Sequence, residues 1–99
     1  MRPKASLEVE RVQTGVRLEK RLLKVLKGLA EYHDISLGDL IEGIALHAFD
    51  GKLPFGDESL ERIRRLKEIY GLDLDSEASH AMRDRTPQSA RPRSRKGGR

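Results

Sequence analysis

The hydrophobic pattern of the chain changes its period between residues 12 and 26, in the stretch VQTGVRLEKRLLKVL. In the first half, apolar or methyl-bearing side chains occupy every second position: Val12, Thr14, Val16 and Leu18. Such alternation is typical of a β-strand with one buried face. From Leu22 onward the apolar residues recur at the three- and four-residue spacing of an amphipathic helix. One short strand cannot form a sheet alone, so its partner must lie elsewhere.

Two helices joined by a tight turn are predicted after the strand. The first covers residues 19–32, and the second starts after Ser36 and ends near Phe49. Asp34 is expected to take the left-handed conformation between them, because Asp tolerates it better than most residues. Ser36 and Asp39 have the spacing of a capping box, in which each residue satisfies a backbone N–H of the other. The sequence therefore predicts a helical hairpin directly after the strand.

The composition indicates one small domain that needs a partner. The chain has 99 residues, of which 36% are hydrophobic and 36% are charged. A domain of this size buries little surface, so oligomerisation is expected. The absence of cysteine excludes disulfides and thiolate metal sites. No apolar run reaches the roughly 20 residues that span a bilayer, which favours a soluble, cytoplasmic protein. We find no signature of an enzyme, a metal site or a cofactor.

The chain divides into four parts by pattern and composition. We expect a flexible arm, a strand–helix–helix domain, an extension with a helix at about 58–70, and a disordered basic tail; these are residues 1–10, 11–50, 51–84 and 85–99. The net charge of +4 is unevenly spread. Residues 1–27 carry eight basic and three acidic residues, and the tail carries six basic and no acidic residues. Such asymmetry favours a polyanionic partner, most often nucleic acid.

A two-fold dimer would give the strand its partner. Strand 12–18 would pair antiparallel with its own copy, forming a two-stranded ribbon over the four helices of two chains. The predicted dimer core consists of Val12, Thr14, Val16, Leu18, Leu22, Leu26, Leu40, Ile41 and Ile44. Gln13, Gly15 and Arg17 would lie on the opposite face of the ribbon. A two-stranded ribbon fits the DNA major groove, which is about 12 Å wide.

The stretch TGVRLEKRLLKVLKGLAEYHDISLGDLIEGIALHAF, residues 14–49, resembles the ribbon-helix-helix DNA-binding superfamily, that of the Arc and Met repressors. The resemblance implies a mainly α fold with one short β-strand, and base contacts from Gln13, Gly15 and Arg17. It also implies phosphate contacts at the start of the second helix; the phosphate set is Arg11, Ser36, Leu37 and Gly38. The sequence departs from the family pattern at Gly15, where a polar side chain is usual, and at Asp34, where Gly is usual.

Three functions remain open from the sequence. The first is a homodimeric, sequence-specific DNA-binding protein of the nucleoid, a transcriptional repressor that can assemble further on double-stranded DNA. The second is an antitoxin-like or partition-type adaptor, which binds DNA with the ribbon and a protein partner with residues 52–84. The third is non-specific nucleic-acid binding through the tail. Packing of the third helix onto the core would weigh against the adaptor.

Overall fold

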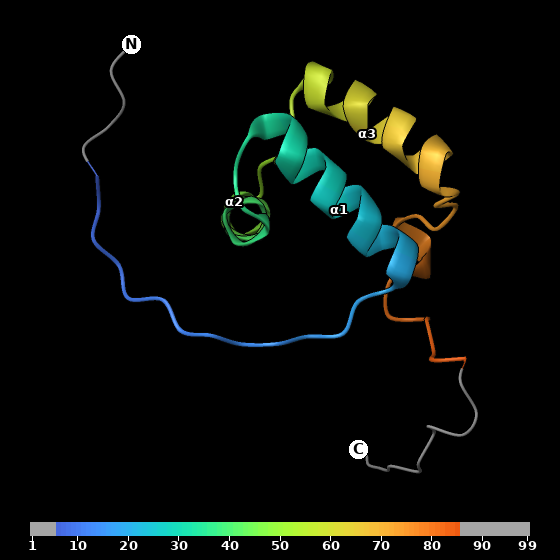
Figure 1. Ribbon diagram of the computed structural model, residues 1–99, viewed down its shortest axis with the longest axis horizontal. Helices are drawn as coiled ribbons and strands as arrows, with labels where there is room; N and C mark the ends of the chain where they lie inside the picture. The colour runs from blue at the N-terminus through green and yellow to red at the C-terminus, as the bar shows by residue number, and fades with distance from the viewer. Residues whose placement is uncertain (1–5, 86–99) are drawn as a thin grey trace.

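The computed structural model describes residues 6–85, which form three α-helices and one short 3-10 helix. In chain order these are α1 (Lys20–His33), α2 (Leu37–Phe49), α3 (Asp57–Tyr70) and η1 (Ser76–Ala78). α1 and α3 lie side by side, and α2, seen nearly end-on in Figure 1, packs across α1. The chain before α1 runs in an extended path past α2 (Figure 1).

The core lies mainly between α1 and α3. Among the described residues, the buried apolar side chains are Val25, Leu29, Ala30, Leu40, Leu66 and Leu72. Gly28 allows the two helices to approach closely, because a Cβ atom there would lie 2.8 Å from Cδ2 of Leu66. The partly buried Ile63 packs against the same core. The third helix therefore folds back onto the first one.

Local hydrogen bonds set the turn between α1 and α2. Asp34 has a φ of 62° and donates its N–H to the carbonyl of Glu31 at 3.0 Å, as expected for a left-handed C-cap. Ser36 Oγ accepts the N–H of Asp39 at 3.0 Å. The Asp39 carboxylate lies 3.5 Å from Nη2 of Arg11. The predicted left-handed turn and serine cap are confirmed, whereas the Asp39 side chain faces the extended segment.

The predicted β-strand is absent. Every residue from 6 to 18 is exposed and has no regular secondary structure, and residues 6–18 make no backbone hydrogen bond to another described residue. A strand exists only when a neighbouring strand completes its hydrogen-bonded ladder, and residues 6–85 contain no such neighbour. The predicted ribbon-helix-helix fold, with a two-stranded ribbon over four helices, is therefore wrong: the structure is three helices with no β-strand in the described part of the chain.

The rest of the predicted organisation is described only in part. Residues 6–10 belong to the extended segment, whereas residues 1–5 and the tail beyond Arg85 lie outside the described residues. The helix expected at about 58–70 is α3. Among the residues described, no helix is both long and apolar enough to cross a membrane.

Candidate nucleic-acid interface

The three residues predicted to contact bases lie together on the extended segment. Gln13, Gly15 and Arg17 are all exposed, and a Cβ atom at Gly15 would meet no other atom within 4 Å. The Arg17 side chain is 83% exposed and forms an ion pair with Asp84, which follows η1. Arg17 therefore lies beside the C-terminal extension, where Asp84 competes with any other anion for its guanidinium.

Arg11 holds the other end of the segment against α2. Its Nε and Nη2 atoms donate to the two carboxylate oxygens of Glu42 at 2.9 and 2.8 Å, in the bidentate geometry of the strongest guanidinium–carboxylate pairs. These hydrogen bonds, together with the charges, raise the pKa of Arg11 and lower that of Glu42. Arg11, which the sequence predicts as a phosphate contact, is thus an attachment point between the segment and α2.

The start of α2 presents the other predicted phosphate contacts. Ser36 and Gly38 are exposed, and Leu37 is half-buried. The first four N–H groups of a helix have no partner within the helix, and the Ser36 side chain takes only that of Asp39. The only neighbour of a Cβ atom at Gly38 would be Ser36 Oγ, at 3.9 Å. At Gly38 the backbone N–H and the helix dipole can therefore meet an anion, while the carboxylate of Asp39 in the same turn is paired with Arg11.

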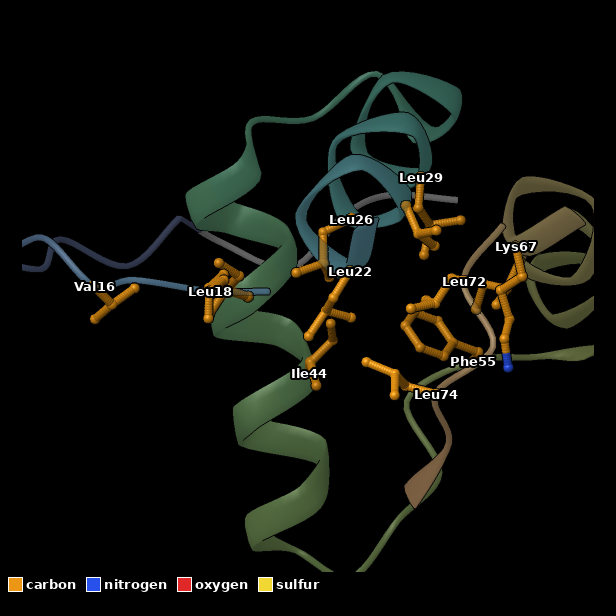
Figure 2. A pocket seen from close by; sticks show the side chains of 13 residues that line it. Val16, Leu18, Leu22, Leu26, Leu29, Ile44, Phe55, Lys67, Leu72 and Leu74 are labelled. Carbon is orange, nitrogen blue, oxygen red and sulfur yellow. The ribbon is translucent and has the colours of Figure 1, made fainter. Parts of the chain in front are cut away.

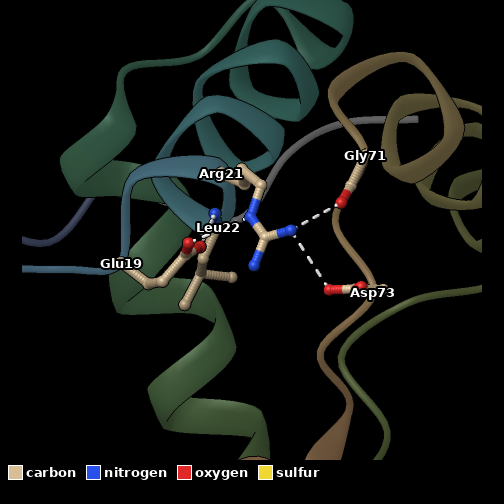
Figure 3. A network of polar contacts seen from close by, with 5 residues as sticks. All are labelled: Glu19, Arg21, Leu22, Gly71 and Asp73. Carbon is tan, nitrogen blue, oxygen red and sulfur yellow. Dashed lines mark hydrogen bonds and ion pairs between the residues drawn. The ribbon is translucent and has the colours of Figure 1, made fainter. Parts of the chain in front are cut away.

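A polar network joins the start of α1 to the end of α3 (Figure 3). Glu19 caps α1 by accepting the N–H of Leu22 at 2.8 Å, and this bond is the main reason that the pKa of Glu19 is lowered. Arg21 donates to Glu19, to the carbonyl of Gly71 at 2.9 Å and to Asp73 at 3.1 Å. Arg21 therefore positions the end of the extended segment against the C-terminal part of the chain.

An apolar groove of about 510 Å³ opens between the three helices (Figure 2). Six of the nine residues predicted as dimer core line it: Val16, Leu18, Leu22, Leu26, Ile41 and Ile44. Of the other three, Leu40 is buried in the core of the single chain, while Val12 and Thr14 are exposed outside the groove. The structure thus brings most of these residues to one surface without pairing the segment as a strand.

Sequence reasoning missed the far wall of the groove. Phe55, from the loop before α3, and Leu72 and Leu74, after it, face the leucines of α1 across the groove (Figure 2). The alternating Leu-Asp-Leu after Gly71 is the sequence signal that could have indicated a half-buried segment. It was too short to count as a periodic element. The role of Arg21 was also missed. Two of its partners, Gly71 and Asp73, are distant in sequence, and the third, Glu19, gave no sign of being an acceptor.

Neither a search for metal-binding clusters nor a comparison with known proteins gives a further indication of function. Within residues 6–85, no three His, Cys, Asp or Glu side chains are grouped so that they could hold a metal ion. Comparison of the chain with protein-family models, curated proteins and solved structures gives no match. The assignment of function therefore rests on the residues and their geometry.

Proposed function

We propose that this chain is a homodimeric, sequence-specific DNA-binding protein of the nucleoid that acts as a transcriptional repressor. One observation carries the proposal: the exposed extended segment presents Gln13 and Arg17, two side chains suited to base edges, between the start of α2 and the basic start of α1. Both side chains are exposed, so the segment can turn them toward base edges in the major groove of DNA.

The two side chains have matching partners in DNA. An arginine donates two hydrogen bonds to O6 and N7 of guanine, and a glutamine pairs with N6 and N7 of adenine. Arg17 gives up only an exposed ion pair with Asp84 on binding, which is a weak competitor. Gly15 lies between the two readers and allows close approach of the DNA. We therefore assign base reading to Gln13 and Arg17 and close contact to Gly15.

The start of α2 supplies the positioning contact. Arg11 ties the segment to the first turns of α2 through Glu42 and Asp39. Asp39 belongs to the first turn of α2, so Arg11 lies near the helix start that carries the N–H groups of Leu37 and Gly38. Phosphate contacts fix the register of a protein on duplex DNA, and base contacts specify the sequence. This arrangement supplies both kinds of contact from one chain.

The apolar groove supports the homodimer. Its lining is almost entirely aliphatic, and the occupant that we propose is a second copy of the chain. Charge complementarity favours this occupant: residues 1–27 carry a surplus of basic groups, and residues 28–57 carry six acidic residues and one lysine. These opposite charges would favour a two-fold contact in which the basic part of one copy faces the acidic part of the other. Repressors that read two half-sites commonly have this symmetry.

The adaptor function is less well supported than DNA reading. It needs the apolar face of α3 for a protein partner, but Leu66 on that face is buried and Ile63 packs against the core of the same chain. Of the three apolar residues at positions 60, 63 and 66, only Leu60 is exposed. A single exposed leucine does not make a helix-binding surface.

Selection of DNA from a random pool, followed by affinity measurements on the selected duplex and a scrambled one, tests the proposal. Arg17→Ala should cost about 1–3 kcal/mol on the selected duplex and much less on the scrambled one. The matched control is Arg64→Ala, which removes another exposed arginine, on α3, and should leave both affinities unchanged. Failure to select any preferred sequence, or equal losses on both duplexes for Arg17→Ala, would contradict sequence reading by this segment.

A further inference from the structure

A second, basic cleft lies between the start of α1 and the end of α3. Its volume is about 920 Å³, and residues 83–85, in the chain that follows η1, form part of its lining. The lining includes six cationic side chains, which are Arg17, Lys20, Arg21, Lys24, Arg83 and Arg85. Only two carboxylates, those of Glu19 and Asp84, line it. The lining of the cleft therefore carries more cationic than acidic side chains.

Four of these cations have no carboxylate partner within the described residues. Arg21 is bound to Glu19, Gly71 and Asp73, and Arg17 is paired with Asp84. Lys20, Lys24, Arg83 and Arg85 form no ion pair there, and every Asp and Glu of the chain lies between residues 6 and 85. Their charge is therefore not neutralised by acidic side chains of the same chain.

The geometry of these groups favours an extended polyanion over a single compact anion. Lys20 and Lys24 are one helical turn apart, about 6 Å along the axis of α1. Lys24 is held over the ring of Tyr70, with its Nζ atom 5.6 Å from the ring centroid. Arg83 and Arg85, from the chain that follows η1, add further positive charge to the lining. Charges distributed along a cleft match a row of phosphates, whereas one small ion could contact only some of them.

We infer that this cleft binds the phosphodiester backbone of double-stranded DNA and supplies sequence-independent affinity. This inference deepens the proposed function. It rests on that function only where it assigns the cleft and the base-reading segment to the same duplex. Arg17 connects the two surfaces, because it belongs to the reading segment and also lines the cleft. The phosphates of a duplex in the cleft repel the Asp84 carboxylate and weaken its exposed pair with Arg17, and the freed guanidinium can then turn to a base.

The test measures the salt dependence of binding to a random-sequence duplex, using the full chain. Each phosphate contact contributes about −0.9 to the slope of log affinity against log salt concentration. Replacing both cleft lysines, by Lys20→Gln and Lys24→Gln, should reduce the magnitude of the slope by roughly one to two per chain. The matched control replaces Lys27 and Lys52, two exposed lysines outside the cleft, by Gln and should leave the slope close to that of the wild type.

The outcomes separate this inference from sequence reading. A reduced slope in the cleft variant alone supports the cleft, even if no preferred sequence can be selected and sequence reading fails. Equal slopes for the cleft variant and the control overturn the inference, even if Arg17→Ala still loses specificity. Vesicles containing phosphatidylserine serve as a second probe; cleft-dependent binding to them without any change on DNA would also overturn it. Circular dichroism of each variant shows whether the helices are retained.

Discussion

Two glycines inside helices should respond in opposite ways to the same substitution. Gly28 lies in α1 and Gly43 in α2. Replacing glycine by alanine inside a helix stabilises the helix by up to about 1 kcal/mol, because alanine loses less backbone entropy on folding. A Cβ atom at Gly43 would meet nothing within 4 Å. Gly43→Ala should therefore raise the free energy of unfolding by up to about 1 kcal/mol.

At Gly28 the new methyl group meets the core. It would lie 2.8 Å from Cδ2 and 3.4 Å from Cδ1 of Leu66, which is itself buried and cannot turn away freely. Overfilling a packed core typically costs about 1–3 kcal/mol. Subtracting the helical gain of about 1 kcal/mol, Gly28→Ala should lower the free energy of unfolding by up to about 2 kcal/mol. The two variants should thus differ by about 1–3 kcal/mol.

Urea and thermal unfolding at one protein concentration would measure this difference, because oligomerisation makes the midpoint concentration-dependent. A difference of 1 kcal/mol corresponds to about 4–8 °C in Tm for a domain of this size. A double-mutant cycle gives the sharper test: in a Leu66→Ala background the clash is removed, so Gly28→Ala should become stabilising. If Gly28→Ala stabilises the unmodified protein as much as Gly43→Ala does, the close contact between α1 and α3 at this point is refuted.

Three further predictions concern the interface and its supports. Asp84→Asn should tighten duplex binding by about two- to fivefold, because it removes an exposed competitor for Arg17; an unchanged Kd would show that the pair does not restrain binding. Glu19→Gln should lower the Tm at neutral pH. The folded-state pKa of Glu19 is lowered from 4.5, so the difference in Tm between wild type and variant should be largest above pH 4.5 and should shrink as the pH falls below it. A difference in Tm that does not change with pH would contradict this. Ile41→Asp, in the groove, should convert a dimer seen by sedimentation into a folded monomer at micromolar concentration. Leu46→Asp, exposed on the same helix outside the groove, should not, and a monomeric wild type would exclude the proposed dimer.

The sequence predicts local features of this fold well. Helix α2 begins directly after Ser36 and ends at Phe49, and the left-handed turn falls on Asp34, as the pattern indicates. These features depend on hydrogen bonds between residues three to five positions apart, so the information lies within a short window. The apolar stripes of the helices are equally local, since they follow from the helical period. Four of the predicted dimer-core residues, those on α1 and α2, consequently line one groove.

The tertiary structure decided what depends on distant partners. The alternation from Val12 to Leu18 satisfies the rule for a strand, but strand formation also needs a second backbone within hydrogen-bonding distance, and residues 6–85 provide none. The groove wall at Phe55 and Leu72 and the basic cleft could not be predicted for the same reason, because each brings together residues that are distant in the sequence. A periodic pattern determines which face of an element is apolar or charged, whereas only the folded chain determines which remote residues share that surface.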